Sequence, residues 1–155
     1  MNKKILALLA VVSLLAYETN ATRGVDISQP YNNFQCFKNN GIDFVITRAW
    51  KSYGDFDSSA LSNIQNARNA GINYVDIYLF PCRGQSATAQ VNNLVSRMGN
   101  ANYGMIWLDI ETNPSGGCSW TQASGSSNCQ YVTELVNAIR AKGKVPGIYA
   151  TYYMW

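Results

Sequence analysis

The chain has 155 residues, of which 47% are hydrophobic, and its 12 basic and 9 acidic side chains give a formal net charge of +3. These charges are scattered and form no basic run, so nucleic-acid binding is not indicated. The absence of histidine excludes Ser-His-Asp and Cys-His catalysis, which leaves carboxylates as the main acid–base groups.

The chain begins with features of a secretory signal peptide. Asn2-Lys3-Lys4 is a short basic start, Ile5–Ala16 is apolar apart from Ser13, and small residues precede a cleavage site after Ala21. The apolar run is shorter than the roughly 20 residues of a membrane-spanning helix. We therefore expect residues 1–21 to be a signal peptide and residues 22–155 to be one exported domain, which is secreted or enters a lysosome or phagosome and does not bind membranes.

All four cysteines lie in the part predicted to be exported, and an even number there favours two disulfides. Cys118 and Cys129 flank a loop rich in Ser, Gly and Asn, so we predict that they pair and, by default, that Cys36 pairs with Cys82. No CxxC spacing is present, and we expect neither a metal site nor a cofactor.

Strand-like and helix-like segments alternate along the rest of the chain, one unit roughly every 30 residues, as in βα repeats. Strands are predicted at Gly24–Ser28, Phe44–Trp50, Tyr74–Phe80, Met105–Glu111 and Val145–Thr151. Helices are predicted near Asn33–Asn39 and over Ser58–Ala70, Ala87–Met98 and Tyr131–Ala141. The glycines predicted to end three of these helices are Gly41, Gly71 and Gly143.

This alternation predicts an α/β fold with parallel strands, either as an open doubly wound sheet or as a barrel. Tyr74–Phe80 and Met105–Glu111 each have one aliphatic face, while the other face becomes polar and aromatic toward the end of the strand. An open sheet covered by helices on both sides would be aliphatic on both faces. The pattern favours a TIM-like (β/α) barrel with a ligand site at the carboxyl ends of the strands.

Three carboxylates are candidates for chemistry at that end. Asp109 and Glu111 are two residues apart on one predicted strand, so their side chains share a face and lie roughly 6.5 Å apart along the chain. One of two such groups can stay protonated while the other is ionised, as glycosidic bond cleavage requires. Asp26 ends the first strand and would reach the same mouth, although it could instead cap the first helix. For Asp76, a buried structural hydrogen bond is the better interpretation.

The order of several short motifs resembles glycoside hydrolase family 25, the Chalaropsis-type lysozymes or N,O-diacetylmuramidases. The motifs are Gly24–Ser28, Phe44–Ala49, Asn69–Ile72, Tyr78–Phe80, Leu108–Glu111 and Pro146–Tyr149. The Asp76–Cys82 stretch is similar to the eukaryotic branch of that family. The resemblance implies an irregular (β/α)5(β)3 barrel that hydrolyses β-1,4 bonds between N-acetylmuramic acid and N-acetylglucosamine in bacterial peptidoglycan, and it implies no cofactor.

The resemblance also implies a role for each candidate residue. Glu111 matches the general acid, and Asp109 matches the carboxylate that orients the acetamido group or stabilises developing positive charge. Asp26 matches an aspartate that shapes the site. Tyr78 and Tyr149 match aromatic residues along the sugar cleft, whereas packing is the better interpretation for Trp107.

Two departures from the family pattern stand out. Leu79 occupies a position that is often histidine in bacterial members. The sequence stops at Trp155, before three further strands that carry another active-site aspartate in the family. We therefore expect about the first five βα units of the barrel, and an incomplete chain that self-associates and has little activity, where the complete protein would be a monomer.

The sequence leaves two other functions open. A chitinase-like enzyme would also end a strand in an Asp-x-Glu motif, but Met105, Ile106 and Trp107 replace its alternating aspartates. A secreted relative without catalysis, either a cell-wall binder or an extracellular signalling factor, is the non-enzymatic alternative. Digestion of purified peptidoglycan beside chitin separates these possibilities.

Overall fold

Strands and helices alternate along residues 22–154, which are the residues that the computed structural model describes. The strands are β1 (Gly24–Ile27), β2 (Phe44–Lys51), β3 (Asp55–Phe56), β4 (Tyr74–Leu79), β5 (Ile106–Asp109) and β6 (Pro146–Tyr149). The helices are α1 (Phe34–Asn39), α2 (Ser59–Asn69), α3 (Ala87–Met98) and α4 (Gly125–Ala141), with a 3-10 turn η1 (Trp120–Gln122). The predicted signal peptide lies outside the described residues.

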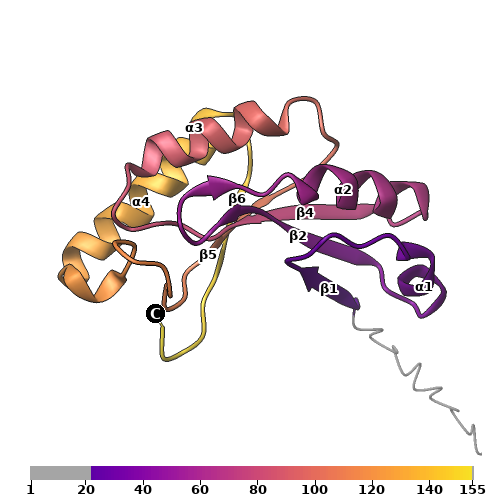
Figure 1. The fold of residues 1–155 in the computed structure, drawn as a ribbon, viewed down its shortest axis with the longest axis horizontal. Helices are drawn as coiled ribbons and strands as arrows, with labels where there is room; N and C mark the ends of the chain where they lie inside the picture. Colours follow the sequence, from indigo (N-terminus) through magenta and orange to yellow (C-terminus); the bar gives the residue numbers. More distant parts are fainter. Residues whose placement is uncertain (1–21, 155) are drawn as a thin grey trace, which may run out of the picture.

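Five of the strands form a parallel sheet in the order β1-β2-β4-β5-β6. Because spatial order follows chain order and parallel crossovers are right-handed, the connecting helices fall on one face of the sheet. Figure 1 shows α2, α3 and α4 on one side of the strands. Among the described residues, β1 and β6 are the edges of the sheet and do not pair with each other, so the sheet is open and no closed barrel is present.

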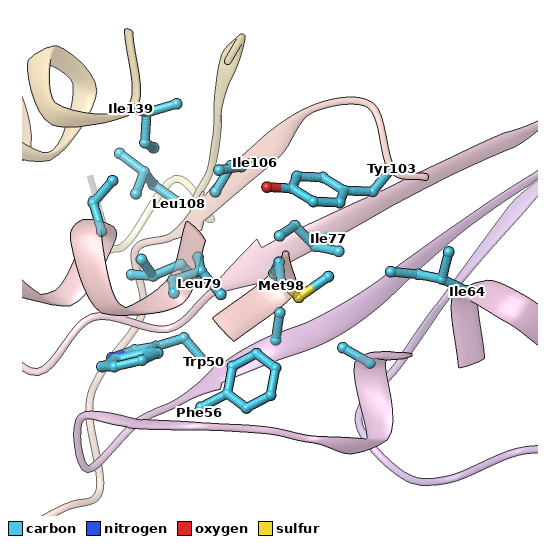
Figure 2. Packing of buried hydrophobic residues seen from close by; sticks show 14 of the residues in the cluster. Trp50, Phe56, Ile64, Ile77, Leu79, Met98, Tyr103, Ile106, Leu108 and Ile139 are labelled. Atoms are coloured by element: carbon cyan, nitrogen blue, oxygen red, sulfur yellow. The ribbon is translucent and has the colours of Figure 1, made fainter. Parts of the chain in front are cut away.

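The core lies between the helices and the aliphatic face of the sheet. The helix-facing strand residues at most 1% exposed include Val45, Val75, Ile77, Leu79, Ile106 and Leu108. Figure 2 shows Ile77, Leu79, Ile106 and Leu108 close together, with Met98 of α3 and Ile139 of α4 in the same cluster. Burial of each such side chain contributes about 1.5–3 kcal/mol, so this face supplies much of the stability of the domain.

Local sequence explains where α3 begins and ends. The Ser86 hydroxyl accepts a hydrogen bond from the Ala89 N–H at 3.3 Å, which caps the first turn. Val91, Leu94 and Met98 are buried on one side of the helix, as their spacing predicts. The helix ends at Gly99, whose φ of +53° lies in the region that favours glycine.

The predicted strands and helices are confirmed with small shifts, apart from three differences. The two-residue strand β3 pairs antiparallel with β2 as a hairpin, and its short Asp55–Phe56 segment has no period that could reveal it. The turn η1 was likewise not predicted. Helix α4 begins at Gly125, within the stretch predicted to be a loop, because the Ser124 hydroxyl caps it by accepting from the Ser127 N–H at 3.3 Å. In residues 22–154, no helix has the length and hydrophobicity needed to cross a membrane.

Candidate active site

Two of the three predicted carboxylates, Asp26 and Asp109, lie on the face of the sheet that the helices leave open, and Glu111 follows the end of β5. Asp26 is exposed near the end of β1, and Asp109, partly buried, is the last residue of β5. Glu111, also partly buried, follows two residues later. Asp26 does not cap α1, because the side chain of Asn33 accepts the Cys36 N–H in that role. The parallel strands therefore bring carboxylates from two distant parts of the chain to one side of the sheet.

The pKa of Asp109 is raised well above its ordinary value. Burial, followed by the negative charges of Glu111 and Asp26, raises the pKa of Asp109 from 3.8 to about 7. Its Oδ1 atom is buried and has no hydrogen-bond partner within residues 22–154. Asp109 thus holds a proton up to near-neutral pH and keeps one polar atom unsatisfied, a combination typical of functional sites.

Glu111 lies beyond the last sheet hydrogen bond of β5. The Ile110 N–H donates to the Tyr149 carbonyl of β6 at 2.8 Å, and the chain then leaves the sheet. Glu111 lines a cavity of about 680 Å³ between the end of β5, α4 and β6, whose other walls include Trp120, Val136 and Ile148. The predicted acid therefore lies at the carboxyl end of β5, beside a largely apolar cavity.

Tyr78 lies among these charges on β4. It pairs in register with Arg48 of β2 and Trp107 of β5. Burial is the main cause that raises the pKa of Tyr78 to about 12; the positive charge of Arg48 opposes this shift, and Asp109 and Asp26 add to it. The phenol consequently stays protonated and can donate a hydrogen bond toward the open face.

Arg48 is a part of the site that the sequence reasoning did not assign. Its Nε donates to Asp57 Oδ2 at 2.8 Å, and its Nη2 donates to the Ser28 carbonyl at 2.7 Å. Burial disfavours ionisation of Asp57, but hydrogen bonds from Ser59 and Arg48 outweigh it and lower its pKa. Arg48 therefore fixes the chain that follows β1 next to β2. A lone cation on the face shared by Phe44 and Ile46 could have marked this residue from the sequence.

Asp76 of β4 and Trp107 of β5 contact each other on the open face of the sheet. The Met105 N–H donates to Asp76 Oδ1 at 2.8 Å, and the Trp107 indole Nε1–H donates to Oδ2 at 2.9 Å. A Cβ at Gly147 of β6 would lie 2.5 Å from Cε3 of the Trp107 ring, so the ring covers that glycine. The structural interpretations of Asp76 and Trp107 are confirmed.

Tyr149 lies on the other side of Asp109. It pairs with Asp109 in the β5–β6 register, and 53% of the residue is exposed. This position is open to a ligand at the mouth, and the role of Tyr149 and Tyr78 in lining a sugar cleft stays a prediction.

The predicted disulfide pairing is wrong. Cys82, just after β4, is bonded to Cys118 in the loop after β5, with their Cα atoms 4.4 Å apart. Cys129, predicted to pair with Cys118, lies on α4 with its thiol free and exposed, and Cys36 on α1 is also free and exposed. The error arose because residues 125–129 are helical and because β4 and β5 are neighbours, so the loops that follow them meet.

A buried polar cluster holds the loop after β4 and was not found from the sequence. Gln90, 1% exposed on α3, accepts from the Cys82 N–H at 2.9 Å and the Trp50 indole N–H at 3.1 Å. Its Nε2 donates to the Cys82 carbonyl at 3.0 Å and to the Tyr131 hydroxyl oxygen. The signal that could have marked it is a glutamine within the apolar stripe of Ala87, Val91 and Leu94.

Several known proteins are similar to this chain in sequence. A family model described as "Lysozyme-like protein 1" matches residues 17–155. "Probable GH family 25 lysozyme 2" of Dictyostelium discoideum is 40% identical over 160 residues, covering 98% of this chain and 71% of that protein. "Lysozyme-like protein 5" of Caenorhabditis elegans is 33% identical, covering 87% of this chain and 63% of that protein.

The chain is also similar in structure to a solved muramidase. The muramidase from Trichobolus zukalii superposes with a TM-score of 0.71 at 26% identity, covering 87% of this chain and 68% of that chain. The sequence therefore spans about two thirds of the length of the proteins it resembles.

Proposed function

Because the chain belongs to the glycoside hydrolase family 25 lysozymes, we propose that it hydrolyses the glycan strands of bacterial peptidoglycan. The bond cleaved is the β-1,4 linkage between N-acetylmuramic acid and N-acetylglucosamine. The observation that carries the proposal is the pair of carboxylates at the end of β5, where the pKa of Asp109 is raised to about 7 by burial and by the charges of Glu111 and Asp26.

The two carboxylates divide the work of glycosidic cleavage. Asp109 holds a proton up to near-neutral pH, because burial and the charges of Glu111 and Asp26 raise its pKa to about 7. Glu111 acts as the general acid and delivers a proton to the leaving oxygen, since it lies beyond the end of β5 and lines the neighbouring cavity. Asp109, with one oxygen buried, stays beneath the sugar and orients its acetamido group or stabilises the developing positive charge.

The remaining side chains bind the sugar and shape the site. Asp26 contributes a second negative charge from β1, which favours an oxocarbenium-like transition state over the neutral substrate. Tyr78, whose pKa of about 12 keeps its phenol protonated, donates a hydrogen bond to a sugar oxygen. Tyr149, exposed beside Asp109, offers its ring to the apolar face of a sugar.

We also propose that the open sheet corresponds to the first five βα units of an irregular (β/α)5(β)3 barrel. Support comes from the five sequentially ordered parallel strands, from α2, α3 and α4 lying on one side of the strands (Figure 1), and from the muramidase superposition. A doubly wound sheet would have helices on both faces, and this sheet has an open face that carries the carboxylates instead.

Export through the secretory pathway is part of the proposal. Peptidoglycan lies outside the cytosol of a cell that digests bacteria, and the Cys82–Cys118 disulfide is of the kind that persists in oxidising compartments. Fusion of residues 1–21 to a reporter protein tests it: we expect the reporter in the medium or in lysosomes, and a reporter that stays in the cytosol contradicts export.

The function is tested by digestion of purified peptidoglycan with the purified chain, followed by borohydride reduction and mass spectrometry. A muramidase leaves reducing ends on N-acetylmuramic acid, so muramitol-ended muropeptides are expected, and chitin incubated in parallel should stay intact. Release of chitin oligomers, or no muramitol ends at any enzyme concentration, contradicts the proposal.

A further inference from the structure

Asn113 is a buried polar side chain that joins three loops at the carboxyl ends of the strands. It is 6% exposed. Its Nδ2 donates to the Ser52 carbonyl in the β2–β3 turn at 2.7 Å and to the Pro81 carbonyl after β4 at 3.0 Å. Its Oδ1 accepts from the Ser115 N–H at 2.8 Å. Both hydrogens of the amide are therefore used by backbone carbonyls of two other loops.

These bonds act on the chain immediately after Glu111. Before Glu111, the Ile110 N–H is fixed to the Tyr149 carbonyl of β6. After it, Asn113 attaches the chain to the loops that follow β2 and β4. Glu111 thus lies between two fixed points, one on each side. If the bonds of Asn113 were lost, the chain after Glu111 would keep only the contact of the Thr112 hydroxyl with the Met154 sulfur.

Two further links tie the same loops together but act farther from Glu111. One is the Cys82–Cys118 disulfide, and the other is the contact between the Ser52 and Ser115 hydroxyls at 2.8 Å. Both join loop to loop. Asn113 is the member of the group nearest to Glu111 in the sequence, so it is the one that transmits the position of these loops to the carboxylate.

We propose that Asn113 is a positioning residue whose three hydrogen bonds fix Glu111 relative to Asp109. The inference rests on the proposed function, because it gives Asn113 a part in placing the proposed acid. An amide fits this task since it offers two N–H donors to two carbonyls and one oxygen to an N–H. Leucine has a similar branched shape and can form none of these bonds.

The ionisation of Asp109 reports where Glu111 stands. The groups that face Asp109 are Glu111 on its own strand segment, Asp26 of β1, Tyr78 of β4 with Arg48 of β2 beside it, and Tyr149 of β6. Burial is the largest cause of its raised pKa, and Glu111 is the largest charge. Because Coulomb interactions weaken with distance, Glu111→Gln lowers the pKa of Asp109 most when Glu111 is held close to it.

The experiment is a ¹³C-carboxyl NMR titration of Asp109 in the full chain, which requires no enzymatic activity. Four proteins are compared: wild type, Glu111→Gln, Asn113→Leu and the double variant. In the wild-type background, Glu111→Gln should lower the pKa of Asp109. We expect this drop to shrink to half or less in the Asn113→Leu background, and equal drops in both backgrounds would overturn the proposal.

A matched pair at Ser115 keeps the test decisive if Asn113→Leu does not fold. Both Ser115→Ala and Ser115→Pro lose the hydroxyl contact to Ser52, but only proline loses the N–H that donates to Asn113 Oδ1. The effect of Glu111→Gln on Asp109 should be smaller in the proline variant than in the alanine variant. The same effect in both would refute the role of Asn113.

Turnover of peptidoglycan separates this inference from the proposed function. Asn113→Leu should lower kcat on the order of 10- to 100-fold, the usual cost of a misplaced catalytic group, with little change in KM. An active wild type and an equally active Asn113→Leu variant would refute the positioning role. An inactive wild type would contradict the proposed function, and the titration would still decide whether Asn113 positions Glu111.

Discussion

The two faces of the same sheet differ in what their side chains contact. On the helix-covered face, residues such as Ile77, Leu79 and Leu108 are fully buried among other apolar groups. On the open face, alternate residues of the same strands are charged or aromatic, among them Arg48, Tyr78 and Asp109. A single parallel sheet therefore supplies stability with one set of alternating positions and chemistry with the other.

The carboxylates on the open face and beside it also differ in whether their oxygen atoms have hydrogen-bond partners. Asp76 accepts hydrogen bonds with both oxygens, and Asp57 is bonded to Arg48 and Ser59. Asp109 has a buried oxygen without a partner. Satisfied carboxylates hold the structure together, whereas the unsatisfied one keeps a high proton affinity and space for a ligand. Substitutions on each face, and at each kind of carboxylate, test this division.

The largest expected effect concerns the open face. Glu111→Gln should lower muramidase activity by about 10²–10⁴-fold, the usual contribution of general acid catalysis, while thermal unfolding stays the same. Glu134→Gln is the matched control, because Glu134 is exposed on α4 and is not among the residues that line the cavity beside Glu111. If Glu111→Gln retains a tenth of the wild-type activity, Glu111 is not the acid.

The next effect concerns the helix-covered face. Leu108→Ala should lower the free energy of unfolding by about 2–5 kcal/mol, because it leaves a cavity in a closely packed core. Leu61→Ala on α2 removes the same atoms from a residue that is 39% exposed and should change stability by less than about 0.5 kcal/mol. Urea unfolding followed by circular dichroism measures both, and similar losses in the two variants would contradict the assigned core.

The disulfide between the loops after β4 and β5 should contribute somewhat less. Replacement of Cys82 and Cys118 by serine is expected to cost roughly 2–4 kcal/mol, whereas Cys36→Ser and Cys129→Ser should cost almost nothing. Peptide mapping without reduction should find Cys82 joined to Cys118. A Cys118–Cys129 peptide would instead restore the pairing expected from the sequence.

Periodicity predicted the strands, the helices and the face on which Asp109 lies, because those features depend on residues close together in the sequence. It placed Glu111 on the same strand, which instead ends at Asp109. The glycines predicted to end helices have the expected positive φ, +73° at Gly41, +79° at Gly71 and +68° at Gly143. Contacts between distant segments were missed. The bonds of Gln90 with Trp50 and of Asn113 with Ser52 and Pro81, like the Cys82–Cys118 disulfide, join segments that meet only after β2, β4 and β5 pair.

The smallest expected effect distinguishes the two kinds of carboxylate through pH. The pKa of Asp109 is about 7 in the folded chain, against an ordinary value of 3.8, because burial and the charges of Glu111 and Asp26 disfavour ionisation. Between these values the folded state holds a proton that the unfolded state has lost. The stability that Asp109 contributes is therefore present below pH 3.8 and is lost as the pH rises through about 7.

Asp109→Asn should remove this pH dependence and make the protein more stable than wild type at pH 8, by on the order of 1 kcal/mol once solvent screening is allowed for. Asp76→Asn is the contrasting variant: its amide N–H₂ would face the Trp107 indole N–H or the Met105 N–H, two donors opposed, so it should destabilise the fold and leave the slope due to Asp109 in place. Thermal unfolding from pH 4 to pH 8 measures both. If Asp109→Asn keeps the wild-type slope, Asp109 is not the unsatisfied, proton-holding group of the open face.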